Sequence, residues 1–340
     1  MKFGLFLNNQ STPSGGLSRR IAESLEQTRA ARDAGFDLVC AGEHYLGYPY
    51  EMPSQFPLLA RVAAEAGKMH VASNITLIAL HNPVAVADAV ATLDAICEGR
   101  FIFGAGLGYR EHEFAAFGVD PKRVVARFLE ALHVIQLLWT PGEIQFKGEF
   151  FEVPKTTPCT FPVQKPHPPI WIAANNDAGV QRAARRGFVW SINPHATIPI
   201  IERQMTLYRS ARQQAGHAPA TDVPLMREMY IAPTREQALK ESMPYIARKY
   251  KVYEAWGQDK ALTKDDTFNL PPEELLKDRF LIGDPDYVIQ RLEEYERRLG
   301  ITYAIFRMQW PDMPHRLAMA EIELMAKHVI PHFKKGKTKE

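Results

Sequence analysis

Three alternating glycines form the most specific ligand-binding pattern in this 340-residue sequence. Gly104, Gly106 and Gly108 follow the short apolar segment Phe101–Phe103, at the point where a strand would pass into a loop. Glycine in such a place lets the backbone approach a flat or anionic ligand closely. An acidic and aromatic segment then leads to Phe117-Gly118 and another helical pattern. The pattern therefore predicts a binding loop between a strand and a helix.

A histidine that follows a second apolar segment is the best candidate for proton chemistry. Glu43-His44 lies directly after Leu38–Ala41, and histidine can donate or accept a proton near neutral pH. The alternative is a structural histidine whose hydrogen bonds are satisfied by Glu43 or by backbone. Because adjacent residues on an extended chain point apart, a structural role for Glu43, such as pairing with an arginine, fits equally well.

The turn Ala173–Asp177 has the composition of an anion site at a helix N-terminus. Free backbone N–H groups and the helix dipole favour a phosphate there. Asn175 and Asn176 tolerate left-handed backbone and carry side-chain donors. A simpler reading is that Asn176 or Asp177 caps the helix, and both readings can hold together.

Two other charge patterns are weaker. Glu111 and Glu113 resemble a glycosidase pair, but two carboxylates in one loop are more often solvated, and nothing else supports sugar hydrolysis. Cysteine and histidine spacings typical of a metal site are absent from the sequence, so no metal is predicted.

Strand-like and helix-like segments alternate along the chain, and eight strands that are each followed by a helical segment predict a single (β/α)8 TIM barrel. The rival, a doubly wound sheet, requires Gly-x-Gly-x-x-Gly at its first turn, which residues 8–16 lack; Tyr109 also stands where Gly104-x-Gly106 would need its third glycine. The expected strands are Lys2–Leu7, Leu38–Ala41, Val71–Leu77, Phe101–Gly104, Ile170–Ala173, Val189–Ile192, Leu225–Ile231 and Tyr303–Met308. The expected helices are Ser18–Ala34, Gln55–Gly67, Val84–Cys97, Val124–Trp139, Ala178–Arg186, Ile198–Gly216, Arg235–Tyr253, Tyr287–Leu299 and Pro314–His332.

Two segments interrupt the alternation. The Pro-rich range 140–168 is expected to be an insertion between the fourth and fifth βα units, with a hairpin near Phe146–Phe150. The polar range 256–282 is expected to be a mobile loop, because long loops in compact domains are often functional lids. We thus expect one domain over residues 1–333 and a charged tail over 334–340.

Composition excludes several classes of protein. A net charge of +2 gives no reason to expect nucleic-acid binding, and no apolar run is long enough for a membrane helix. The apolar start of the chain is too short for a signal peptide. Cys40, Cys97 and Cys159 are odd in number and far apart, which favours reduced thiols in the cytoplasm.

Taken together, these motifs resemble the bacterial luciferase-like flavin monooxygenases. The glycine-rich fourth strand and Phe117-Gly118 match the family pattern, as do Glu43-His44 and, in order along nearly the whole chain, several further short segments. Those segments are Met1–Gly4, His81–Pro83, Pro169–Asn175, Gly283–Pro285 and Val329–Pro331.

The resemblance implies a cytoplasmic, homodimeric, FMN-dependent two-component monooxygenase. A separate flavin reductase would supply reduced FMN, and O2 would add at the flavin C(4a) atom to give a peroxide. That peroxide would oxygenate a small apolar substrate such as a carbonyl compound, with His44 serving the oxygen chemistry. Two alternatives stay open: hydride transfer with an 8-hydroxy-5-deazaflavin cofactor, as in other members of the superfamily, and a non-catalytic flavin-binding protein.

The resemblance also implies site residues. Asn74-Ile75 falls where family members often have a non-proline cis peptide that supports the flavin ring. Leu107 stands where luciferase has a phosphate-binding arginine, so Arg110 or Arg127 would supply that charge; the alternative for Arg127 is a helical ion pair with Glu130. The expected cofactor-binding residues are Asn74, Ile75, Gly106, Leu107, Gly108, Tyr109, Arg110, Arg127, Ala174, Asn175 and Asn176. Separately from the resemblance, Tyr45, Trp190 and Trp310 are expected to line a substrate pocket because they lie near the barrel mouth, the alternative being ordinary packing in the core or at the surface.

Overall fold

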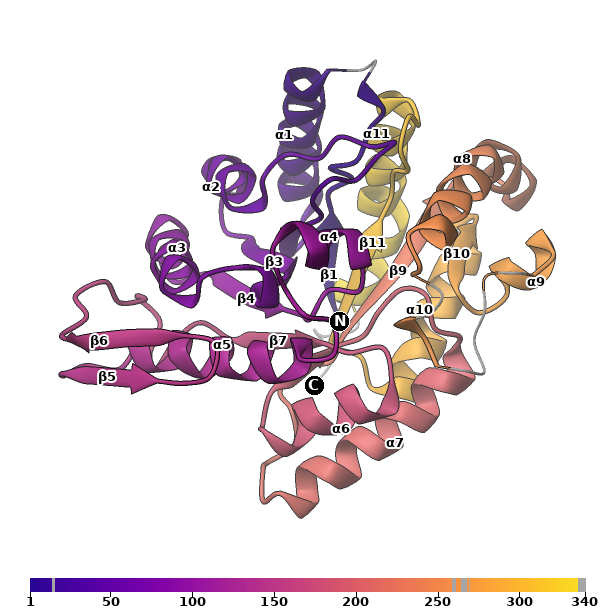
Figure 1. Cartoon of the computed structure of the whole chain (residues 1–340). Coiled ribbons are helices and arrows are strands. Elements are labelled where there is room, and N and C mark those ends of the chain that lie inside the picture. The colour runs from indigo at the N-terminus through magenta and orange to yellow at the C-terminus, as the bar shows by residue number, and fades with distance from the viewer. Residues whose placement is uncertain (14–15, 259–260, 264–267, 269, 336–340) are drawn as a thin grey trace.

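A computed structural model gives the fold of the chain as one α/β body (Figure 1). It describes all residues except 14–15, 259–260, 264–267, 269 and 336–340, together with the side chains of 272–273 and 335. A nine-stranded sheet forms the centre, and helices cover its outer face. All strand pairs within this sheet are parallel.

The order of strands in the sheet is β10-β9-β11-β1-β2-β3-β4-β7-β8. The first strand of the chain therefore lies between the second and the last, which brings the two ends of the sequence together at the middle of the sheet. The strands are β1 (Lys2–Phe6), β2 (Leu38–Ala41), β3 (His70–Thr76), β4 (Phe101–Ala105), β7 (Ile170–Ala173), β8 (Val189–Ser191), β9 (Pro224–Ile231), β10 (Phe280–Gly283) and β11 (Tyr303–Arg307).

The sheet curls so that its two ends approach each other. Ile192, just beyond β8, forms a single parallel bridge with Leu225 of β9, and the Met226 amide donates to the Ile192 carbonyl over 3.1 Å. The expected count of eight strands is wrong by one, because β10 pairs with the second half of β9.

The helices begin and end where local signals place them. Asn82 caps one helix by accepting from the Val84 amide, and Pro83 provides its first turn. Asp284 caps another in the same way, and Gly300 ends that helix in the left-handed region. The helices are α1 (Leu17–Ala34), α2 (Gln55–Ala66), η2 (Ile78–Leu80), α3 (Pro83–Ile96), α4 (Glu111–Ala116), α5 (Val124–Leu138), α6 (Asp177–Arg185), α7 (Ile198–Gln214), α8 (Arg235–Ala255), α9 (Pro272–Leu276), α10 (Pro285–Leu299), α11 (His315–Leu324), η4 (Met325–Val329) and α12 (Ile330–Lys335).

Alternate residues of the strands form two different cores. One set packs with the helices in a large apolar cluster. The other set forms a small cluster with contributions from seven strands, as expected for side chains that fill the inside of a curled sheet. Its buried members are Phe6, Leu38, Cys40, Ala72, Ile102, Trp171, Met226, Tyr303 and Ile305.

A two-stranded antiparallel hairpin of β5 (Ile144–Lys147) and β6 (Glu152–Thr156) lies between α5 and β7 and projects from the body in Figure 1. Its turn is tied to α5 by Glu130, whose carboxylate accepts from the amides of Glu149, Phe150 and Phe151 over 2.7–2.9 Å. The hairpin falls within the range 140–168, where the sequence predicts one.

The range 256–282 is only in part a loop. Phe280–Ile282 belongs to β10, so the loop prediction is wrong there: the strand has only four residues and follows a polar, Pro-rich stretch that hides it. Pro272–Leu276 forms α9. Residues 259–260, 264–267 and 269 lie outside the described part of the chain, so the role of this range as a lid stays a prediction.

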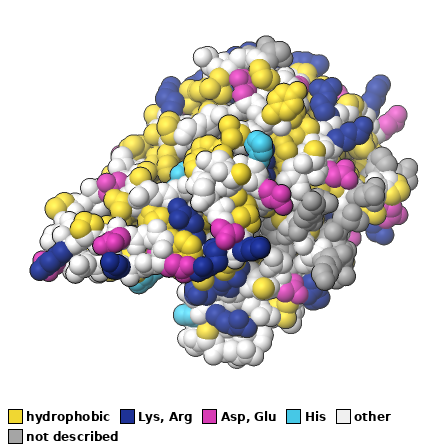
Figure 2. All heavy atoms as spheres, in the orientation of Figure 1, with side chains coloured by type: hydrophobic (Ala, Val, Ile, Leu, Met, Phe, Trp, Pro, Cys, Tyr) yellow, Lys and Arg dark blue, Asp and Glu magenta, His cyan; other side chains and the backbone are white. Residues whose placement is uncertain are grey.

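Among the described residues, no helix is both long and apolar enough to cross a membrane. On the face shown in Figure 2, basic and acidic side chains are interspersed, which agrees with the nearly balanced composition.

Candidate active site

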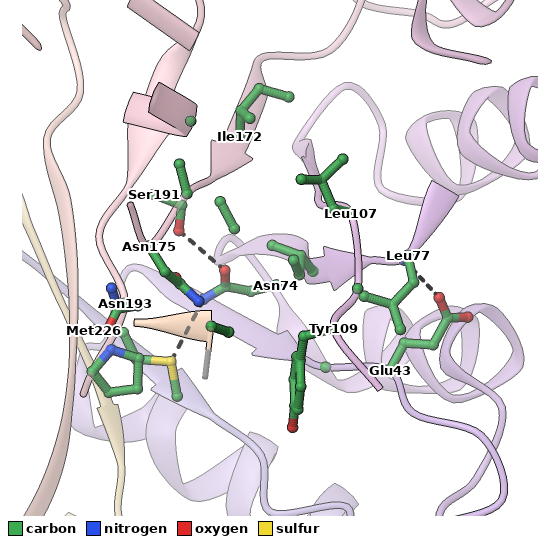
Figure 3. A pocket seen from close by; sticks show the side chains of 18 of the residues that line it. Glu43, Asn74, Leu77, Leu107, Tyr109, Ile172, Asn175, Ser191, Asn193 and Met226 are labelled. Atoms are coloured by element: carbon green, nitrogen blue, oxygen red, sulfur yellow. Dashed lines mark hydrogen bonds between the residues drawn. The ribbon is translucent and has the colours of Figure 1, made fainter. Parts of the chain in front are cut away.

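A cavity of about 370 Å³ lies at the carboxyl ends of the strands. Parallel sheets bind their ligands at this end, and the volume is in the range of small-molecule sites. Its wall is apolar where β4, α5 and β7 meet, and polar near the ends of β1, β8, β9 and β11. Figure 3 shows part of this lining, including Leu107, Ile172 and Asn175. The apolar part includes Leu107, Phe128, Leu129, Leu132 and Ile172, and the polar part includes Asn9, Gln10, His195, Glu228 and Arg307.

The structure brings most of the predicted site residues to this cavity. The predicted residues that line it are His44, Asn74, Ile75, Leu107, Gly108, Tyr109, Ala174, Asn175 and Asn176. Six others lie near it without lining it: Gly106, Arg110, Arg127, Tyr45, Trp190 and Trp310.

His44 is held by a carboxylate that the sequence did not connect with it. Its Nδ1 atom lies 3.0 Å from Oε1 of Glu113, which is completely buried on α4. Because that carboxylate accepts, Nδ1 carries the proton and Nε2 is left as the acceptor. Nε2 makes no hydrogen bond to any residue that the structure describes.

Glu113 is anionic in this setting. Burial raises the pKa of its carboxyl group, whereas the hydrogen bond from His44 lowers it. The Tyr45 amide, 2.8 Å away, and Arg110, 3.1 Å away, act in the same direction, so the net pKa lies below its usual value. The expectation that Glu113 is a solvated charge is wrong, because α4 turns it inward under His44.

Glu43 has the structural role that was one of the two alternatives, although its partner is not an arginine. Its carboxylate accepts from the Leu77 amide (2.8 Å) and from the Tyr45 hydroxyl (2.7 Å), and it contacts His81 Nε2 at 3.0 Å. These bonds join the loop after β2 to the segment after β3. Glu43 therefore fixes the loop that carries His44 without contacting that ring.

Asn74 lies at the centre of the cavity in Figure 3. The Asn74–Ile75 peptide bond is cis, as the family resemblance implied. The Ser191 hydroxyl donates to Asn74 Oδ1 over 3.2 Å, and Asn74 Nδ2 lies 4.0 Å from the sulfur of Met226. Asn74 is thus fixed from two other strands.

Two of the three glycines serve packing within the sheet and do not line the cavity. A Cβ atom on Gly104 would lie 2.1 Å from the Ser73 carbonyl oxygen, and one on Gly106 would lie 2.0 Å from Cδ1 of Ile75. Only Gly108 lines the cavity, with a φ of +81°. The structure shows a close approach of Gly106 to Ile75 of β3.

Two arginines that sequence reasoning missed lie at the α6 end of the cavity. Arg182 and Arg186 line it together with Gly179 and Asn176. Asn176 Oδ1 caps α6 by accepting from the Gly179 amide over 2.9 Å. Burial and the charge of Arg186 both lower the pKa of Arg182, which has no hydrogen bond or ion pair to any described residue. Gly179, Arg182 and Arg186 are separated by three and then four residues, so they lie on one face of the helix. This spacing can be read from the sequence.

The two arginines that were expected to replace the missing charge at Leu107 point elsewhere. Arg110 donates to the Tyr45 carbonyl (2.6 Å) and to Glu113, and so fixes the loop around His44. Arg127 donates to the Ala79 carbonyl over 2.8 Å. The ion-pair alternative for Arg127 is also wrong, because Glu130 binds the hairpin turn instead.

The three aromatic residues expected in the substrate pocket are all engaged behind its wall. The Trp190 indole donates to the Ala174 carbonyl (2.9 Å), and the Trp310 indole donates to Glu228 (2.6 Å). Tyr45 bonds to Glu43. A polar group on a buried aromatic ring finds a hydrogen-bond partner. Here the partners Glu43, Ala174 and Glu228 line the cavity, whereas the three aromatic residues behind them do not.

The polar wall contains a buried ion pair. Lys249 of α8 binds Glu228 of β9, and both side chains are fully buried. Burial raises the pKa of Glu228, but the charges of Lys249 and Arg307 outweigh it, so Glu228 is ionised. Burial lowers the pKa of His195 to about 3, so this imidazole is neutral; its Nδ1 lies 3.0 Å from the Tyr250 hydroxyl.

Comparison with known proteins gives the class to which this fold and cavity belong. Residues 1–302 match the family model described as luciferase-like monooxygenase. The chain therefore belongs to the luciferase-like monooxygenase family.

The relatives include a monooxygenase and a dehydrogenase. The chain is 25% identical to the oxygenase component of a flavin-dependent trigonelline monooxygenase from Acinetobacter baylyi, over 99% of this chain and 97% of that protein. It is also 24% identical to an F420-dependent glucose-6-phosphate dehydrogenase from Nakamurella multipartita, over 85% of this chain and 87% of that protein.

Solved structures share the fold. A monooxygenase from Streptomyces bottropensis superposes with a TM-score of 0.85 at 24% identity, covering 98% of this chain and all of that one. The oxygenating constituent of 3,6-diketocamphane monooxygenase from Pseudomonas putida, solved with FMN, superposes with a TM-score of 0.79 at 19% identity, covering 97% and 98%.

Proposed function

We propose that this protein is the oxygenase component of a two-component monooxygenase that binds reduced FMN and uses O2 to oxygenate a small organic substrate. The observation that carries the proposal is the buried His44–Glu113 pair at the edge of the cavity of a luciferase-like chain. A relative that is itself named an oxygenase component supports a separate reductase as partner. We further propose that the enzyme works as a homodimer in the cytoplasm.

The residues of the cavity fit a flavin. Arg182, which pairs with no described residue, offers a cation near the N-terminus of α6, which suits the FMN phosphate. In the cavity wall, Asn193 Nδ2 and Asn9 Oδ1 are buried and without partners among the described residues. The pyrimidine edge of a flavin carries both acceptors and a donor that would satisfy them.

Each part of the chain then has its own task. Bound reduced FMN supplies the electrons that activate O2. Asn176 and Arg182 bind and orient the phosphate, the apolar wall formed by residues such as Leu132 excludes water, and His44 holds or accepts a proton at Nε2.

A hydride-transferring reductase that uses a deazaflavin is the second candidate, favoured by the F420-dependent relative. A flavin-binding protein without turnover is the third. One rapid-mixing experiment separates the three: protein with reduced FMN is mixed with O2, and the return of the oxidised flavin absorbance is followed.

We expect that return to be slower than for free FMN, with less hydrogen peroxide released when substrate is present. Reoxidation at the rate of free FMN, together with tight binding of the deazaflavin, would favour the second candidate. Tight FMN binding with no delay and no oxygenated product would favour the third.

A further inference from the structure

The polar wall of the cavity contains a guanidinium group that makes no ion pair with any residue that the structure describes. Arg307 is the last residue of β11, lines the cavity and is only 6% exposed. Its Nη1 atom lies 3.3 Å from Gln10 Oε1 and 3.5 Å from Asn8 Oδ1, which are long contacts to neutral groups. Its guanidinium lies over the ring of Phe6, 4.5 Å from the centroid, and its Nε atom is buried without a partner among the described residues.

No described carboxylate lies within ion-pair distance of Arg307. Two carboxylates of the described part of the chain line the cavity, and both are already bound to other groups. Glu228 is paired with Lys249 and accepts from the Trp310 indole. Glu43 is bound by the Leu77 amide and by its other partners in the loop after β2. Among the described residues, the Arg307 Nη1 atom therefore donates to neutral amide oxygens.

A buried cation that lacks a charged partner is costly, so its presence at a cavity wall indicates the ligand that completes it. The planar guanidinium fork matches a carboxylate in geometry and binds it far more strongly than a neutral group. Because the His195 imidazole is neutral, it adds no positive charge to the part of the wall beside Arg307.

We propose that Arg307 binds a carboxylate group of the substrate, so that the enzyme acts on a small organic acid. This inference rests on the proposed function and replaces the expectation of a wholly apolar substrate. The other possible source of a partner is the pyrimidine edge of the flavin itself, and the experiment separates the two sources.

The test measures equilibrium binding by calorimetry at pH 7, with and without bound oxidised FMN. The probes are two matched pairs, benzoate with benzamide and nicotinate with nicotinamide, in which only the charged group differs. We expect each carboxylate to bind wild-type protein at least ~10-fold more tightly than its amide, and Arg307→Gln to abolish that preference.

The variants include a conservative change and two controls. Arg307→Lys keeps the charge without the fork and should keep part of the preference. Arg248→Gln changes an exposed arginine of α8 that pairs with Asp312 away from the cavity, and should have no effect. Arg182→Gln should weaken FMN binding and leave the carboxylate preference intact, which is the reverse of the Arg307→Gln pattern.

Three outcomes overturn the inference. Wild-type protein that binds acid and amide equally, or binds neither, shows that Arg307 is not a carboxylate receptor. Arg307→Gln that weakens FMN binding but keeps the acid preference assigns the guanidinium to the flavin. If Arg307→Gln keeps both the preference for the acid and the FMN affinity, the Arg307 guanidinium serves the fold alone. A fourth result would separate the inference from the proposed function. If the carboxylate preference is intact but flavin reoxidation in the rapid-mixing experiment is not slowed, the proposed function is overturned and Arg307 remains an acid-binding residue.

Discussion

The Nδ1 atom of His44 lies 3.0 Å from a carboxylate oxygen of Glu113, 69 residues further along the chain. The buried carboxylate fixes the tautomer of the ring, so the two residues act as one unit. Their coupling can be measured by changing each one separately and then both together.

Glu113→Gln removes the charge that orients His44 while keeping the size of the side chain. We expect the yield of oxygenated product per reduced FMN to fall by about 10- to 100-fold, with FMN affinity nearly unchanged. His44→Ala should act similarly, and the double variant should be no worse than the worse single one, because the residues share one task. Glu111→Gln on the same helix is the matched control, since that residue is exposed. Losses that add in the double variant would contradict a common role.

Asn176→Asp tests the phosphate position without disturbing the fold. Aspartate caps a helix as well as asparagine, so α6 should stay intact. The added negative charge should weaken FMN binding about tenfold. Fluorescence titration of FMN measures this, and unchanged affinity would show that the phosphate binds elsewhere.

Arg182→Gln should weaken FMN binding by about 10- to 100-fold, because a charge-assisted hydrogen bond to the phosphate is lost. Arg185→Gln is the matched control: this residue lies on the same helix, is exposed and does not line the cavity. Equal losses in the two variants would point to general electrostatic attraction in place of a specific contact.

Gly106→Ala should destabilise the protein by about 1–3 kcal/mol, because its methyl group would overlap Cδ1 of Ile75. Ile75→Val removes that atom. The double variant should therefore recover most of the stability that Gly106→Ala loses, measured by chemical unfolding against Ile75→Val alone. An unrescued loss would mean that the backbone of β4, and not the side chain of Ile75, sets the requirement for glycine.

His195 should make the stability depend on pH. Burial lowers its pKa from 6.5 to about 3 in the folded protein. Between these values the unfolded chain binds a proton that the folded protein does not, so stability falls as the pH falls. By pH 4 the loss from this group is ~3 kcal/mol.

His195→Gln should therefore flatten the decline in melting temperature between pH 7 and pH 4. His112→Gln, at an exposed position, should leave the decline as in wild type. Parallel curves for wild type and His195→Gln would show that other groups cause the acid sensitivity.

Much of the fold could be predicted because its signals are local. Caps such as Asn82 and Asp284, and short apolar segments between helices, place the elements from neighbouring residues alone. Strand β10 escaped prediction because four residues after a polar stretch carry too little pattern. Its place is decided by pairing with β9, about fifty residues earlier in the chain.

The sequence predicted which segments form the site, but not which residues within it make contact with one another. The loops after β2, β4 and β7 do meet at the cavity, since the carboxyl ends of parallel strands share one side. The partner of His44 was not predictable, because Glu113 belongs to another loop and neighbours in sequence point apart. The aromatic residues were misplaced because a buried Trp turns toward a hydrogen-bond acceptor, and only the tertiary structure shows where that acceptor lies.

Trp256 offers a built-in optical reporter. The other four of the five tryptophans are buried, whereas Trp256 is half-buried at the end of α8, 5.6 Å from the ring of His44. It stacks on Tyr253, which lines the cavity, and on the guanidinium of Arg110. Its emission should therefore respond to ligand entry near His44 while the buried indoles give a steady background. A Trp256→Phe variant would separate the two signals, so binding can be followed without any label.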